Sequence, residues 1–166
     1  MRRGPDGRRV DRAPGLTRLV NPLAAGAWNA DAQEYQKATR GTRWFESSRS
    51  ALTIKMLVEA ENLGGSELEI GEITFPAGSV PRRGHNHTSI EIFYVLSGEL
   101  EHVVNGESYL LTPGMVGIVR PGDEVIHRIP GNEPVRALVI WVPGGEAARI
   151  APGFDQRPGG SGSGGR

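Results

Sequence analysis

The region between residues 43 and 142 is divided into short runs that turn-forming residues separate at close intervals. The runs alternate apolar and polar side chains, or are rich in β-branched and aromatic residues, as β-strands are. Asn105-Gly106, between two of these runs, predicts a hairpin with a type I′ turn. The predicted strands span residues 44–47, 51–59, 67–75, 91–96, 99–104, 107–111, 116–119, 125–129 and 135–142. Short strands without helices between them predict an all-β sandwich or barrel.

The two ends of the chain differ from this β-rich region in composition. The first residues are rich in Arg, Gly and Pro, and the last ones are mainly Gly and Ser, so neither end has much to bury. The expected segments are a disordered leader at 1–15, an N-terminal arm at 16–44, a barrel at 45–145 and a flexible tail at 146–166. Within the arm, residues 16–20 are compatible with a short strand and residues 31–38 with a helical turn.

Composition excludes several classes of function. The 166 residues suit a single domain, and the formal net charge of zero gives no electrostatic basis for nucleic-acid binding. The arginine-rich leader leaves a nucleic-acid arm open, but a disordered leader is the preferred interpretation. Without cysteine there can be no disulfide, thiolate zinc site or thiol nucleophile. No apolar run reaches membrane-spanning length, and none follows the basic N-terminus as in a secretory signal, so we expect a cytoplasmic protein without a membrane partner.

Three of the four histidines are arranged as one set of metal ligands. His85 and His87 are two residues apart, so on a strand they face the same way, and Glu91 opens the next strand. His127 belongs to an apolar, inward-facing row of another predicted strand. Buried imidazole and carboxylate groups need a partner, and a divalent cation satisfies all four. Three nitrogens and one oxygen suit iron(II), manganese, nickel, zinc or cobalt, and suit calcium poorly.

The spacing of these residues resembles the two sequence motifs of the cupin superfamily. The first motif is His-x-His, three residues, Glu, six residues and Gly, which His85, His87, Glu91 and Gly98 match without a gap. The second motif brings a Gly, then Pro-Gly and the last His, which Gly114, Pro121, Gly122 and His127 resemble. The resemblance implies a small single-domain cupin, a jelly-roll or double-stranded β-helix barrel that holds one divalent metal ion.

Three residues are candidates for a catalytic role. Resemblance to oxalate-degrading cupins implies that Arg82 lies by the metal and steadies an anionic substrate or bound oxygen, although the adjacent Arg83 favours a solvated turn. His102 shares a strand face with apolar neighbours and is either a pocket acid or base or an ordinary buried histidine. Glu91 can act as a base when substrate displaces it from the metal.

The resemblance leaves the reaction open, because the same barrel serves many functions. We expect a metal-dependent, dioxygenase-like oxidation of a small oxygenated organic molecule, with Fe²⁺ or Mn²⁺ favoured and Ni²⁺ or Zn²⁺ as alternatives. A non-redox cyclase or isomerase and a non-catalytic ligand-binding or regulatory cupin are the other candidates. A homodimer is expected, because small cupins often pair through their sheet faces and the arm at 16–44 has apolar residues that need cover.

Overall fold

The computed structural model describes residues 40–81 and 83–159. The leader, most of the N-terminal arm with its predicted strand and helical turn, Arg82 and the last residues of the chain lie outside the described residues. The described elements are β1 (Arg43–Glu46), β2 (Thr53–Val58), α1 (Ala60–Leu63), β3 (Glu69–Phe75), β4 (Ile90–Ser97), β5 (Leu100–Val104), β6 (Glu107–Leu111), β7 (Val116–Val119), β8 (Val125–Arg128), β9 (Val135–Val142), α2 (Glu146–Ile150), the 3₁₀ helix η1 (Ala151–Gly153) and β10 (Asp155–Pro158).

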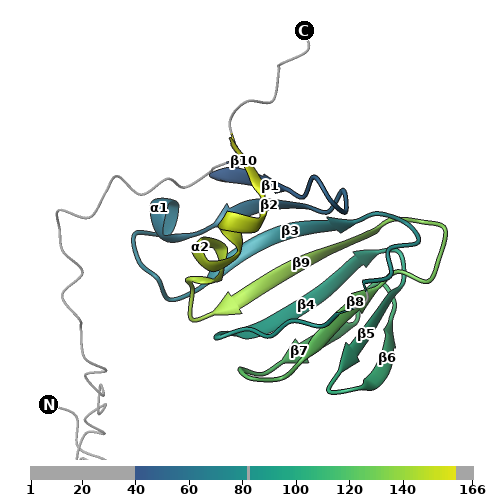
Figure 1. Ribbon diagram of the computed structural model, residues 1–166. Helices are drawn as coiled ribbons and strands as arrows, with labels where there is room; N and C mark the ends of the chain where they lie inside the picture. Colours follow the sequence, from purple (N-terminus) through teal and green to yellow (C-terminus); the bar gives the residue numbers. More distant parts are fainter. Residues whose placement is uncertain (1–39, 82, 160–166) are drawn as a thin grey trace, which may run out of the picture. The chain divides into compact units, whose positions relative to one another are not determined.

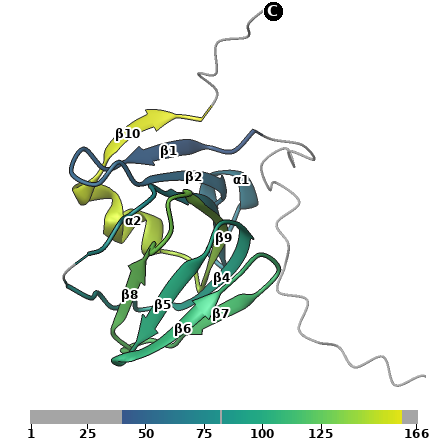
Figure 2. The same cartoon turned by 90° about the vertical axis from the view of Figure 1, so that its right-hand side faces the viewer.

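The strands form two antiparallel sheets that face each other (Figure 1). The larger sheet has seven strands in the order β10-β1-β2-β3-β9-β4-β7, and the smaller has three in the order β6-β5-β8. Figure 2 shows the three-stranded sheet in front of β9 and β4, with α2 beside them. The all-β jelly-roll barrel predicted from the sequence is therefore confirmed.

Strand alternation decides which side chains enter the barrel. On β4, Glu91, Phe93 and Val95 are buried, while Tyr94 between them is exposed. The registers of β4 with β9 and with β7 place Glu91 opposite Trp141 and Val119 respectively, and both of these side chains are buried. A carboxylate thus lies within an inward row that is otherwise apolar, as the period-two pattern predicted.

Each strand predicted between residues 44 and 142 is present, with ends that differ by at most two residues. The predicted hairpin is also present, and Asn105 and Gly106 both have positive φ, as a type I′ turn requires. His85 and His87, by contrast, do not lie in a regular strand. The segment that carries them makes a single bridge to β8, between His85 and Val125.

The prediction of a flexible tail from residue 146 is wrong over residues 146–158. These residues form α2, η1 and β10, and β10 pairs with β1 at the edge of the larger sheet. Ala147 is fully buried, and the ring of Phe154 packs against that of Phe45 with centroids 5.9 Å apart. The glycine-rich composition of the residues that follow predicts flexibility, but the few apolar residues of this short segment are enough to pack it against the barrel. No helix in the described part of the chain is long and apolar enough to cross a membrane.

Candidate metal centre

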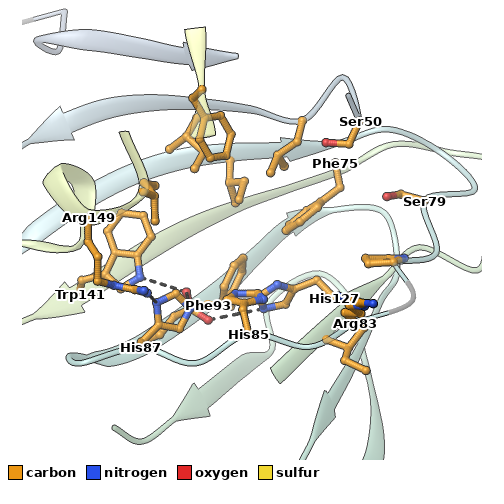
Figure 3. Close-up of a pocket in the computed structure, with 18 residues that line it drawn as sticks. Ser50, Phe75, Ser79, Arg83, His85, His87, Phe93, His127, Trp141 and Arg149 are labelled. Atoms are coloured by element: carbon orange, nitrogen blue, oxygen red, sulfur yellow. Dashed lines mark hydrogen bonds and ion pairs between the residues drawn. The ribbon is translucent and has the colours of Figure 1, made fainter. Parts of the chain in front are cut away.

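The four predicted metal ligands line one cavity, and Figure 3 labels the three histidines among them. Glu91 comes from β4, His127 from β8, and His85 and His87 from the segment between β3 and β4. The ring of His85 lies 4.8 Å from that of His87 and 5.3 Å from that of His127, between centroids. The Glu91 carboxylate reaches both remaining imidazoles, with Oε2 2.9 Å from His87 Nε2 and Oε1 3.5 Å from His127 Nε2.

Backbone hydrogen bonds hold the two histidines that precede β4 against β8. The amide of His85 donates to the Val125 carbonyl at 3.0 Å, and the Val125 amide donates back to the His85 carbonyl at 2.8 Å. The amide of Gly122 donates to the His87 carbonyl at 3.3 Å. These bonds aim both imidazoles at the cavity, although the segment is not a strand. His87 is buried and His85 is exposed at the cavity rim.

Several buried polar atoms at this point have no hydrogen-bond partner among the described residues. They include His87 Nε2, Glu91 Oε1 and His127 Nε2. His87 Nε2 is close to Glu91 Oε2, but the contact lacks hydrogen-bond geometry. Buried polar atoms without partners are costly and rare, and Glu91 lies beside both imidazoles. The ligand atoms of His85, His87 and Glu91 lie close enough together to share one metal ion. The residues therefore fit a divalent cation, which their nitrogen and oxygen atoms would coordinate together.

Burial and neighbouring charges shift the pKa values of three of the candidate ligands. Although His85 is exposed at the cavity rim, the protein around its ring removes much of its contact with bulk water. This desolvation, reinforced by the nearby His127, lowers the pKa of His85 to about 4. For Glu91 burial raises the pKa, but the adjacent imidazoles of His127 and His87 outweigh it and hold the pKa far below the ordinary carboxyl value. For His87 burial lowers the pKa, but Glu91 and Glu146 together more than compensate, so that the pKa is raised. A metal ion would have to displace that proton.

Sequence analysis missed one residue of the centre, Glu146 at the start of α2. Its side chain is fully buried, and Oε1 accepts hydrogen bonds from the amide and hydroxyl of Thr88 at 2.7 and 2.8 Å and from the Ser89 amide at 3.2 Å. Oε2 accepts from Arg149 Nε at 2.6 Å and lies 3.3 Å from His87 Nδ1. Burial opposes ionisation of Glu146, yet the hydrogen bonds from Thr88 and Arg149 lower its pKa to about 2. No motif marked this residue, because it lies in the predicted tail.

The second predicted catalytic residue, His102, lies behind the centre rather than in the cavity wall. It pairs across β5 and β8 with His127, and the two rings stack with centroids 5.2 Å apart. Its side chain is 2% exposed, and burial together with His127 lowers its pKa to about 4. His102 Nε2 has no partner among the described residues, and with Glu91 and His127 it forms a second group that can hold a metal. Its catalytic role stays a prediction, as does that of Arg82.

A cavity of about 460 Å³ opens onto the candidate ligands. Its walls are largely apolar, with Ile54 and Phe75 from the larger sheet and Phe154 from the C-terminal segment. Among the described residues, the lining includes two arginines, Arg83 and Arg149 (Figure 3). The volume and the mixture of apolar walls with a few polar groups are typical of small-molecule sites.

Comparison with known proteins identifies the family. Residues 71–141 match the sequence model of the cupin domain, so this part of the chain is a cupin domain, as its two motifs predicted. No curated protein matches the sequence significantly.

Solved structures of low sequence identity share the fold. An RmlC-like cupin from Shewanella frigidimarina is 22% identical with a TM-score of 0.55, over 70% of this chain and 96% of that one. A putative ethanolamine utilization protein Q from Salmonella typhimurium is 22% identical with a TM-score of 0.52, over 60% and 75%. An ectoine synthase from P. lautus is 21% identical with a TM-score of 0.51, over 64% and 75%.

Proposed function

We propose that this cupin is a metal-dependent enzyme that acts on a small oxygenated organic molecule, and that its reaction is a dioxygenase-like oxidation. The observation that carries the proposal is that His87, Glu91 and His127, which have unpartnered buried imidazole and carboxylate atoms, line a largely apolar cavity. Such a site combines an open metal position with a place for an organic ligand. Fe²⁺ or Mn²⁺ is the favoured ion, with Ni²⁺ or Zn²⁺ as alternatives.

In this proposal His85, His87, Glu91 and His127 hold the metal. When bound, the ion supplies Lewis-acid and redox chemistry to a chelating substrate such as an enediol or hydroxyketone. The protein contributes the apolar walls, which exclude water and strengthen electrostatic interactions at the centre. Glu91 contributes a carboxylate that can accept a substrate proton, and Trp141 Nε1 steadies it by donating to Oε2 at 3.0 Å.

A non-redox cyclase or isomerase is the second candidate. The same ligand set with zinc would serve as a Lewis acid without oxygen. The similar structure from P. lautus is an ectoine synthase, which is named for a synthesis and not for an oxidation. The third candidate, a non-catalytic ligand-binding cupin, would use the cavity and the metal for binding alone.

We expect the purified protein to carry about one divalent ion per chain and to consume oxygen with a chelating substrate. The test measures metal content together with oxygen uptake on catecholic, flavonol and diketone substrates. Protein stripped with a chelator is the control and should be inactive until it is reloaded. Turnover that is equal with and without oxygen would support the cyclase or isomerase. Metal-dependent ligand binding without turnover would support the binding protein.

The outer face of the larger sheet supports the predicted homodimer. The strand registers align four isoleucines in one cross-strand row, which we call the outer isoleucine row: Ile70, Ile140, Ile92 and Ile118. Beside this row Tyr94 and Val116 are also exposed, by 39% and 51% respectively. Continuous apolar patches of this kind mark interaction sites. We propose that a second copy of the chain covers the row, since an apolar face is complementary to itself about a two-fold axis and the neutral chain has no net charge to oppose pairing.

Ile118→Glu should convert the proposed dimer to a monomer, because Ile118 is 57% exposed and would bring a charge into the apolar interface. Light scattering at working concentration measures the mass. Leu63→Glu is the matched control, since Leu63 is 40% exposed on α1 and should leave the dimer intact. A monomeric wild type, or a dimeric Ile118→Glu variant, would contradict the proposal.

A further inference from the structure

The two nitrogens of His87 face different partners. Nε2 points to Glu91 and the other candidate ligands, while Nδ1 lies 3.3 Å from Glu146 Oε2. A neutral imidazole has one protonated nitrogen and one free lone pair. If Nε2 is to bind a metal, the proton must sit on Nδ1, and a buried N–H in that position needs an acceptor.

Only Glu146 meets that need among the described residues that contact Nδ1. The other close group, the guanidinium of Arg149, has a nitrogen 3.3 Å from Nδ1 but can only donate. That same nitrogen already donates to the Asn86 carbonyl at 2.8 Å. Its second N–H can donate to Nδ1 only in the tautomer that has no proton there. When Nδ1 carries the proton, Glu146 Oε2 is the acceptor within reach of the ring.

We infer that Glu146 is a positioning residue of the metal centre, which accepts the Nδ1–H of His87 and so keeps Nε2 free to bind the metal. The inference rests on the proposed metal site and adds to it a residue outside the cupin-domain match at 71–141. Partners of this kind orient metal-binding histidines and raise their basicity.

The surroundings of Glu146 allow its carboxylate one orientation. Three donors from Thr88 and Ser89 occupy Oε1, and Arg149 Nε occupies Oε2 on the side that also faces His87. The side chain is fully buried, so it cannot exchange these bonds for water. Helix α2 thereby fastens the backbone that follows His87, and the C-terminal segment becomes part of the metal centre and not only a cover for the cavity.

Glu146→Gln should reverse the tautomer of His87. The amide oxygen of the glutamine must face the two backbone donors of Thr88 and Ser89, because an NH₂ group there would meet N–H groups. The NH₂ group then takes the place of Oε2, where Arg149 Nε loses its acceptor, and donates to Nδ1. The proton of His87 moves to Nε2, where it blocks metal binding. We expect the affinity for Zn²⁺ to fall about 10- to 100-fold, the usual cost of losing such a partner.

Glu69→Gln is the matched control, because it would weaken the packing of helix α2 without removing the contact between Glu146 and His87. Glu69 is also a buried carboxylate, and its Oε2 accepts a hydrogen bond from the Ala147 amide at 2.9 Å in the same helix. It does not contact His87 in the described structure. The Glu69→Gln variant should therefore retain the wild-type tautomer and the wild-type affinity for Zn²⁺.

Two measurements on the full-length chain test the inference. Nitrogen-15 NMR of the metal-free protein at about pH 9, above the ordinary histidine pKa, reports which nitrogen of His87 carries the proton. Competition between protein and a chelating dye for Zn²⁺ reports affinity without any assay of activity.

The inference predicts an Nδ1–H tautomer in the wild type and in Glu69→Gln. It predicts an Nε2–H tautomer and weaker Zn²⁺ binding in Glu146→Gln. An unchanged tautomer in Glu146→Gln, or equal weakening in both variants, overturns it. A wild type that binds Zn²⁺ poorly but shows the tautomer change would count against the proposed function alone.

Discussion

His87→Ala is expected to lose most of its bound metal, because the change removes a buried ligand and leaves two carboxylates without their shared neighbour. Glu91 Oε2 lies 2.9 Å from His87 Nε2, and Glu146 Oε2 lies 3.3 Å from Nδ1. The loss should exceed the about 10- to 100-fold weakening that removal of an outer hydrogen-bond partner costs. Elemental analysis after desalting measures the ions per chain, with wild type expected near one.

His102→Gln is the control that decides which residues hold the ion. His102 is buried, and its Nε2 lies with Glu91 and His127 in the second candidate group. If the metal lies at the cavity, this variant should keep its metal, because His102 does not line the cavity in the described structure. Full metal in His87→Ala would refute the proposed ligand set, and loss confined to His102→Gln would move the ion to the second group.

The barrel could be predicted from the sequence because its signals are local. Strand alternation and turn residues depend on near neighbours, so the strands and the turn at Asn105-Gly106 were found within two residues. The candidate ligands were also found from local information, since His85, His87 and Glu91 lie within one short segment. His127 could be added because the cupin motifs fix its order along the chain.

The residues that the sequence did not reveal are those whose roles depend on contacts distant along the chain. Glu146 acts on His87 from 59 positions away, and a lone glutamate after a turn has no pattern that marks such a partner. The sequence could not decide between the two roles considered for His102 for a related reason. Its strand face is inward as predicted, but the stacked ring of His127 lies beside it, and His102 does not line the cavity in the described structure.

The C-terminal segment shows the limit of composition as a guide. Glycine-rich sequence predicts flexibility correctly only when no neighbour offers an apolar surface to cover. Here Phe154 finds Phe45, and β10 adds to the edge strand β1. The same packing brings Arg149 to the cavity, so a segment that the sequence assigned to a tail contributes to the site.

Glu91→Gln is expected to keep substantial metal and to lose about two orders of magnitude in turnover, the usual scale for loss of a general base. Trp141 Nε1 donates to Glu91 Oε2 at 3.0 Å, so in the variant the amide oxygen should occupy this position and remain available as a neutral ligand. The NH₂ group would then replace Oε1, the atom nearest His127 Nε2, and it cannot accept a proton.

Turnover per bound metal ion, measured with the substrate that supports oxygen uptake, separates the base role from the ligand role. Glu69→Gln is again the control, because it removes a buried charge outside the cavity lining and should retain wild-type turnover.

The pH dependence of the rate adds a second readout. Loss of a basic group should abolish the acid limb of the rate profile in Glu91→Gln, while a variant that lost only metal would keep the wild-type profile on its residual loaded fraction. Wild-type turnover in metal-loaded Glu91→Gln would refute the base role and leave Glu91 as a ligand alone.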